Sequence, residues 1–224
     1  MSSDNNAKRG TRTLTSPLVL ETIGWIVLVC CLLVVCTDLI LGFFLQPNYS
    51  PISDTISDLA AGGRYAKWQD LAMEAFAISI VLTGIGLLMA RRTGGRWIAG
   101  AAAMVVTGIL VFFIAKRDEY GDLDKGGLVL HYWMVYAMAA LVPASLLLLR
   151  KDIAHRSDRT RAILILFAAL TILWIVGSPI FYFMDTAYDG LIERALAAVM
   201  IVWIAVCARS LTKERRLDED GGDD

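Results

Sequence analysis

Histidine is scarce in this 224-residue chain, which contains only His131 and His155. A haem held between two helices needs two histidines at membrane depth, and a three-histidine zinc centre needs three. His155 lies among Arg150, Lys151 and Arg156, as is typical of a solvated basic loop. We therefore predict no haem, no bound metal and no other cofactor.

Cysteine is almost as rare, and its positions exclude a disulfide framework. The four cysteines all lie within apolar stretches: Cys30, Cys31, Cys36 and Cys207. None lies in a polar segment in which an oxidising compartment would pair it. We interpret them as small buried hydrophobic residues.

Charge is the third shortage, and it sets the class of protein. Only 19% of the residues are charged, 57% are hydrophobic, and the mean hydropathy is +0.59. A run of about 20 apolar residues spans the roughly 30 Å hydrocarbon core of a bilayer. Six runs qualify: Leu18 to Leu45, Leu71 to Ala90, Trp97 to Ala115, Leu128 to Leu149, Ala162 to Met184 and Leu191 to Ala208. We predict an all-α polytopic membrane protein, folded as a bundle of six transmembrane helices.

The segments between these runs are short, so a single membrane domain is expected. We assign residues 1–16 to an N-terminal tail, 17–208 to the membrane domain and 209–224 to a C-terminal tail. The first run is too long for the apolar region of a signal peptide, and Gln46, Pro47 and Asn48 follow it instead of a small-residue cleavage site. It is expected to remain as the first transmembrane helix.

Lysine and arginine are distributed unequally between the two sides of the predicted bundle. Fifteen lie in the tails and in the second and fourth connecting loops, whereas the other loops hold five. Because basic loops favour the cytoplasmic side, both termini are predicted to be cytoplasmic. The protein is predicted to be integral to the plasma membrane of the cell. Membrane lipids are the expected partners, with a membrane-protein partner as an alternative; nothing predicts nucleic-acid binding.

A layer of ionisable residues lies inside the apolar runs, toward the predicted outer side. Its members are Asp38, Glu74, His131, Glu193 and Arg194. Such groups are costly at membrane depth and usually face a cavity, the bundle interior or a partner charge. Arg194 is expected to pair with Asp38, Glu74 or Asp118. The layer predicts an outward-facing pocket or an ion-pair lock.

The first outer loop repeats Ile-Ser-Asp between Ser50 and Leu59. With Ser50 as N-cap and Pro51 in the first turn, this segment is predicted to be a short interfacial helix. Such a helix would place Ile52, Ile56 and Leu59 on one face and Asp54 and Asp58 together on another. The two acids would either cap and solvate the helix or point into the polar layer.

Together these segments resemble the uncharacterised six-helix membrane family called domain of unknown function 998. The likeness is carried by Pro47 to Leu59, by Asp118 and His131, and by Gly190-Leu191-Ile192-Glu193-Arg194. The chain departs from the family pattern at Ala115 to Arg117, which replace a proline-containing approach to Asp118. More distantly, it looks like the FRAG1/DRAM type of six-helix protein, some of whose members act on or near membrane lipids.

Three classes of function fit these residues. The favoured one is a non-enzymatic membrane protein whose outer pocket binds a lipid headgroup or supports a membrane complex. Its candidate ligand-binding residues are Arg194, Asp38, Glu74, Asp58 and Asp54. The second class is a lipid-modifying enzyme with Asp118, His131 and Glu193 as catalytic candidates and Arg194 on a phosphate. The third, a small-solute transporter, lacks polar residues leading to the cytoplasm.

Overall fold

The computed structural model describes residues 16–61, 64–90, 94–116, 130–155, 157, 159–183 and 186–213. The described elements are helical: α1 (Pro17–Ile40), the π-helical turn η1 (Leu41–Leu45), α2 (Ile56–Ala61), α3 (Ala66–Met89), α4 (Gly95–Lys116), α5 (Leu130–His155), α6 (Thr160–Phe183), the 3-10 turn η3 (Thr186–Tyr188) and α7 (Asp189–Thr212). The all-α prediction is confirmed.

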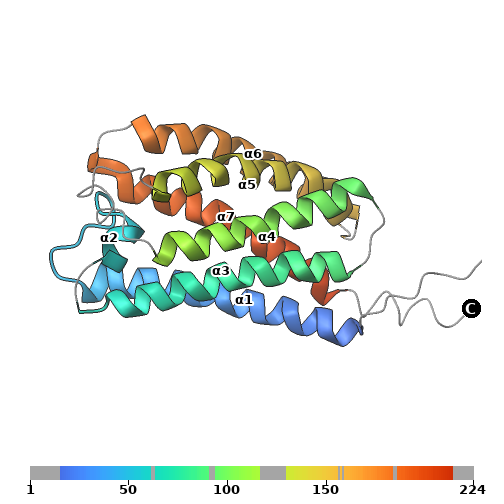
Figure 1. The fold of residues 1–224 in the computed structure, drawn as a ribbon, viewed down its shortest axis with the longest axis horizontal. Helices are drawn as coiled ribbons and strands as arrows, with labels where there is room; N and C mark the ends of the chain where they lie inside the picture. The colour runs from blue at the N-terminus through green and yellow to red at the C-terminus, as the bar shows by residue number, and fades with distance from the viewer. Residues whose placement is uncertain are drawn as a thin grey trace, which may run out of the picture.

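The long helices pack side by side along one direction (Figure 1). Each contacts its neighbour in the order α1, α3, α4, α5, α6, α7, and α7 returns to α1, which closes the ring. Helix α7 also touches α3 and α5, so it is the most central of the six. The ring brings the end of α1 next to the beginning of α7, although they lie far apart in the sequence.

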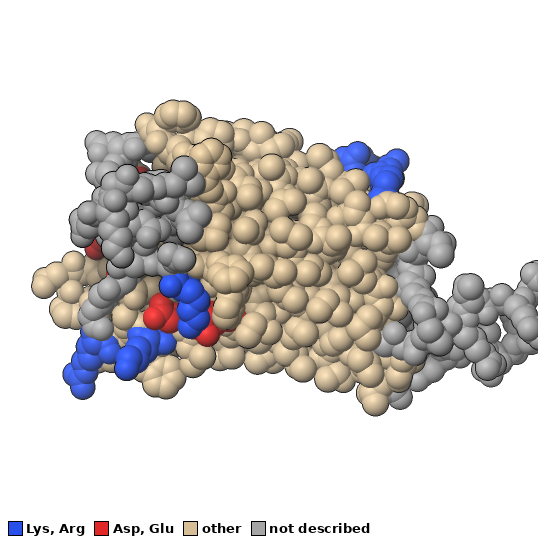
Figure 2. Space-filling model, viewed as in Figure 1, with Lys and Arg blue, Asp and Glu red and all other residues tan. Residues whose placement is uncertain are grey.

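Six helices in the described part of the chain are long and apolar enough to cross a membrane. Their outer surfaces carry large exposed apolar side chains, among them Phe44, Ile165 and Ile172. Figure 2 shows that charged side chains on the visible face gather toward the two ends and leave the middle uncharged. The predicted six-span bundle is confirmed, and the protein is a multi-pass membrane protein.

One half of the bundle, remote from α2, is densely packed. Leu20, Leu87, Trp97, Trp203 and Leu211 are each at most 2% exposed there. The indole Nε1 of Trp97 donates to the Leu87 carbonyl at 2.9 Å, which joins α3 to α4. This half holds the first turns of α1 and the last turns of α7.

Helices α3 and α4 approach closely because glycine lies at their contact. A Cβ atom on Gly84 would lie 2.9 Å from the Ala101 carbonyl oxygen, and one on Gly108 would lie 2.9 Å from that of Ala77. Small residues are the usual means by which membrane helices come into close contact.

The predicted helix beginning at Ser50 is wrong in its start and in its buried face. Residues 51–54 form turns, and α2 begins only at Ile56. Ile56 and Leu59 are buried but Ile52 is 54% exposed, so the three do not form the predicted common face. The carbonyls of Pro51 and Asp54, which a helix would use internally, instead accept hydrogen bonds from Arg194 of α7. Tertiary contacts therefore override the local helical pattern.

Candidate functional site

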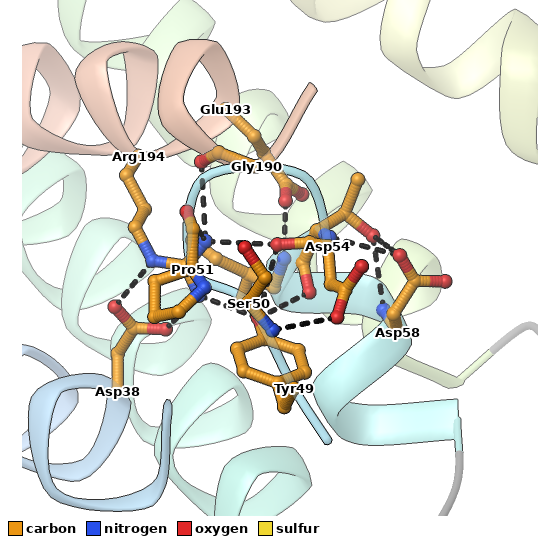
Figure 3. Close-up of polar contacts among 11 residues, drawn as sticks. Asp38, Tyr49, Ser50, Pro51, Asp54, Asp58, Gly190, Glu193 and Arg194 are labelled. Carbon is orange, nitrogen blue, oxygen red and sulfur yellow. Dashed lines mark hydrogen bonds and ion pairs between the residues drawn. The ribbon is translucent and has the colours of Figure 1, made fainter. Parts of the chain in front are cut away.

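Arg194 and Asp38 form the centre of a polar network at the α2 end of the bundle (Figure 3). Arg194 Nε donates to Asp38 Oδ2 at 3.0 Å, and Nη2 donates to Oδ1 at 3.0 Å. The two side chains are only 15% and 13% exposed. This two-point ion pair joins α7 to α1, and Asp38 is one of the three partners predicted for Arg194.

Arg194 also holds the segment between η1 and α2, residues 46–55, which we call the strap. Its Nη1 donates to the carbonyls of Pro51 at 2.9 Å, Asp54 at 3.0 Å and Gly190 at 3.1 Å. Nη2 donates to the hydroxyl of Tyr49 at 2.5 Å. A guanidinium has five N–H groups, and each has an acceptor here.

Gly190 lets the strap lie directly on the first turn of α7. A Cβ atom at this position would lie 2.1 Å from the Asp54 carbonyl oxygen and 2.8 Å from that of Pro51. The adjacent Leu191 N–H donates to the Ile52 carbonyl at 3.0 Å. The strap thus supplies an acceptor to the otherwise open N-terminus of α7.

Asp54 of the strap and Asp58 of α2 each cap their own segment. Asp54 Oδ2 accepts the Ser50 N–H at 2.7 Å, which closes the turn before α2. Asp58 Oδ2 accepts the Thr55 N–H at 2.8 Å, and the Thr55 hydroxyl accepts the Asp58 N–H at 3.0 Å. These reciprocal hydrogen bonds between Thr55 and Asp58 form a capping box, which fixes where α2 begins. Both acids cap, as one of the two predicted arrangements has it, and Asp58 also lies beside the polar layer, as the other has it.

Glu193 of α7 holds the beginning of α2. Its Oε2 accepts the backbone N–H of Ile56, the first residue of α2. Glu193 and Arg194 are adjacent in the sequence and take separate partners, as expected for side chains about 100° apart around a helix. Together they fix both the strap and α2 to α7.

Tyr49 bonds to Arg194 and to the strap backbone. Its hydroxyl donates to the Thr55 carbonyl at 2.6 Å while it accepts from Arg194. Burial raises the pKa of Tyr49 to about 12, and the nearby Arg194 opposes that rise only in part. Tyr49 is therefore a neutral phenol that can keep donating at physiological pH.

A cavity of about 740 Å³ lies beneath the strap and α2, inside the ring of helices. All six spanning helices contribute to its wall. The apolar part of the lining includes Val34, Val35, Met73, Phe76, Val111, Ile114, Met138, Trp174, Phe181, Leu196, Met200 and Ile201. Its polar part includes Asp38, Ser53, Thr55, Ser57, Asp58, Gln69, Asp189, Glu193 and Arg194.

The polarity of this wall changes with depth. On α7, Asp189, Glu193 and Arg194 come first and Met200 and Ile201 come last, over about 18 Å at 1.5 Å per residue. Helix α3 follows the same order, because Gln69 precedes Met73 and Phe76. The cavity is polar under the strap and apolar toward the middle of the bundle.

Gln69 and Asp189 of this wall have buried side-chain atoms without a hydrogen-bond partner. Gln69 is 0% exposed, and neither the nitrogen nor the oxygen of its side-chain amide has a partner. The buried Oδ1 of Asp189 likewise has none. An unsatisfied buried polar group costs about 1–3 kcal/mol, so these atoms are candidate hydrogen-bonding groups for a molecule in the cavity.

The other predicted residues lie elsewhere or outside the described residues. Glu74 of α3 pairs with Lys116 of α4 and does not line the cavity. Asp118 lies outside the described part of the chain, as does the side chain of His131, whose backbone belongs to α5. Among the described residues, no three His, Cys, Asp or Glu side chains are placed to hold a metal ion.

Sequence reasoning missed Tyr49 and Gln69. Tyr49 lies inside the Pro47 to Leu59 segment, so its place in that motif was the available signal. Gln69 begins an i, i+4, i+7 series with Met73 and Phe76, which places the three on one helical face. That spacing would have indicated a polar group at the end of a buried apolar stripe.

Comparison with known proteins gives a family and no activity. No curated protein and no solved structure matches the chain. The family model described as a protein of unknown function (DUF998) matches residues 27–210. That range includes Asp38, the strap, Gln69, Glu193 and Arg194. The chain therefore belongs to the DUF998 family of proteins of unknown function.

Proposed function

We propose that this membrane protein binds one amphiphile, a lipid or a lipid-like molecule, in the cavity beneath the strap. Its polar end lies against Gln69 and Asp189, and its apolar chain extends toward Met200. The observation that carries this proposal is Gln69, whose amide is wholly buried in the cavity wall without a partner. A folded protein rarely leaves such a group unsatisfied unless a ligand or water completes it.

The size and graded polarity of the cavity support an amphiphile. Ligand pockets commonly measure about 300–1,000 Å³ and are mostly apolar with a few polar groups that fix orientation. The volume of about 740 Å³ lies within that range. The polar groups are confined to one end, so a molecule with a head and a tail matches the wall better than a uniformly polar solute.

The engagement of Glu193 and Arg194 supports binding over catalysis. A general acid or base must reach the substrate, but the Glu193 carboxylate accepts the Ile56 N–H and so holds α2. Arg194 has an acceptor for each of its N–H groups within the protein. Both residues are better suited to hold the roof of the cavity than to act on a substrate.

The dense half of the bundle supports binding over transport. The cavity lining does not include Leu87, Trp97, Leu149 or Trp203, and all four are at most 2% exposed. A solute in the cavity therefore meets packed side chains in the described half of the bundle away from the strap.

The test is native mass spectrometry of the protein purified in a mild nonionic detergent. Ala197 lines the cavity, whereas Ala195 of the same helix is exposed and does not. We expect a bound small amphiphile on the wild type and on Ala195→Phe, and its loss on Ala197→Phe, which fills the cavity. Absence of any bound molecule from the wild type would refute the proposal, as would equal retention by both variants.

We also propose that the strap faces outward from the cytoplasm in the plasma membrane, because the basic loops lie at the other end. A membrane-impermeant thiol reagent applied to intact cells should label a cysteine placed at Tyr188 but not one placed at Thr93. The reverse labelling would contradict this orientation.

A further inference from the structure

The ionisable groups around the cavity are mostly acidic. Among the described lining residues there are four carboxylates and one cation: Asp38, Asp58, Asp189 and Glu193 against Arg194. Asp38 pairs with Arg194, Asp58 caps α2 and Glu193 accepts the Ile56 N–H. Asp189 differs from these three, because its Oδ1 is buried without any hydrogen-bond donor.

Arg194 is poorly placed to bind a phosphate. An arginine usually binds a phosphate with two parallel N–H groups of its guanidinium. Here Nε and Nη2 hold Asp38, while Nη1 holds the strap carbonyls. A phosphate would have to displace the contacts that fix the roof of the cavity.

Gln69 gives a second, independent indication of the headgroup. Its carbonyl oxygen needs a donor and its amide nitrogen needs an acceptor, and neither has one. Asp189 Oδ1 needs a donor only. Two of the three unmet requirements are therefore for donors, so the missing group must carry N–H or O–H bonds.

We propose that the amphiphile bound here carries a protonated amine in its headgroup and no phosphate. This inference rests on the proposed function and specifies its ligand. A hydrogen bond from any N–H or O–H group to a carboxylate is charge-assisted, and a protonated amine adds Coulomb attraction to it. It also compensates the charge of Asp189, which a hydroxyl headgroup does not. The amine donates to Asp189 and to the Gln69 carbonyl.

Three probes with the same chain and different headgroups test the proposal: dodecylammonium, dodecyl glucoside and dodecyl phosphate. Each is titrated into the full-length protein in polyoxyethylene ether micelles, and occupancy is read by native mass spectrometry. We expect dodecylammonium to bind at least about tenfold more tightly than dodecyl phosphate, with the glucoside between them. A tenfold ratio corresponds to about 1.4 kcal/mol.

The Asp189→Asn variant should lose most of the preference for the amine while its affinity for dodecyl glucoside stays close to that of the wild type. Retained glucoside binding shows that the cavity is intact. Asp70→Asn is the matched control, because it removes the same charge from a residue that does not line the cavity. It should leave the order of the three probes unchanged.

The outcomes separate this inference from the proposed function. If the phosphate or the glucoside binds as tightly as the amine, or if Asp70→Asn acts like Asp189→Asn, the amine assignment is overturned. The cavity would still be a binding site if Ala197→Phe abolished all binding. If none of the probes binds the wild type at the cavity, the proposed function itself fails.

Discussion

Replacing Arg194 with glutamine tests whether the ion-pair lock holds the strap. The substitution leaves Asp38, which is 13% exposed, without its cation. Removing one partner of a buried ion pair typically destabilises a protein by about 3–5 kcal/mol. The strap carbonyls of Pro51 and Asp54 lose their donor at the same time. Arg194→Gln should therefore fall at the upper end of that range.

Each kcal/mol shifts the melting temperature of a protein of this size by about 2–4 °C, so a loss of about 5 kcal/mol lowers it by roughly 10–20 °C. A thiol-reactive fluorophore provides the assay, because Cys207 is wholly buried and becomes reactive on unfolding. Cys36, which was predicted to be buried, is exposed and gives a constant background in the folded protein. Arg194→Lys should lie between the wild type and Arg194→Gln, since an ammonium cannot match the two-point bond to Asp38. Arg209→Gln, at an exposed position of α7, is the control. If Arg194→Gln melted within about 2 °C of the wild type, the ion pair would not hold the strap.

Three further predictions follow from the strap and the cavity. Gly190→Ala places a methyl group 2.1 Å from the Asp54 carbonyl oxygen and should cost about 1–3 kcal/mol or more in a melting assay. Gly94→Ala, in open space, should cost little, and equal costs would contradict the close contact. Tyr49 should ionise near pH 12 in an absorbance titration compared with Tyr49→Phe; ionisation near its ordinary pKa of 10.0 would contradict its burial. Because the fold favours the neutral phenol, its contribution to stability is complete below pH 10.0 and is lost as the pH rises through about 12. Gln69→Leu should raise the melting temperature of delipidated protein, since it removes a buried unsatisfied amide worth about 1–3 kcal/mol; a lower melting temperature would mean that the amide has protein partners.

The sequence was sufficient to predict the spanning helices because each depends on the composition of a continuous run. It also limited the partners of Arg194, since an unpaired guanidinium at membrane depth is costly. The sequence could not decide among the three acids, because no single segment determines the order of the helices around the ring. The contact of α7 with α1 is what selects Asp38.

The strap was harder to predict because its conformation depends on a distant residue. Locally, Ser50 to Leu59 favours one helix, and the capping box between Thr55 and Asp58 does start one. Arg194, more than 130 residues later, donates to the carbonyls of Pro51 and Asp54, which a helix beginning at Ser50 would have used in its own hydrogen bonds. The role of Gln69 was equally hard to predict, because its unpartnered amide is evident only once the helices enclose the cavity.

The most direct test of the bound amphiphile is an experimental map of the protein purified from its native membrane without added lipid. We expect elongated density in the cavity, with its polar end within hydrogen-bond distance of Gln69 and Asp189 and its chain directed toward Met200. A cavity without such density, or one collapsed so that the Gln69 amide bonds to the protein itself, would contradict it.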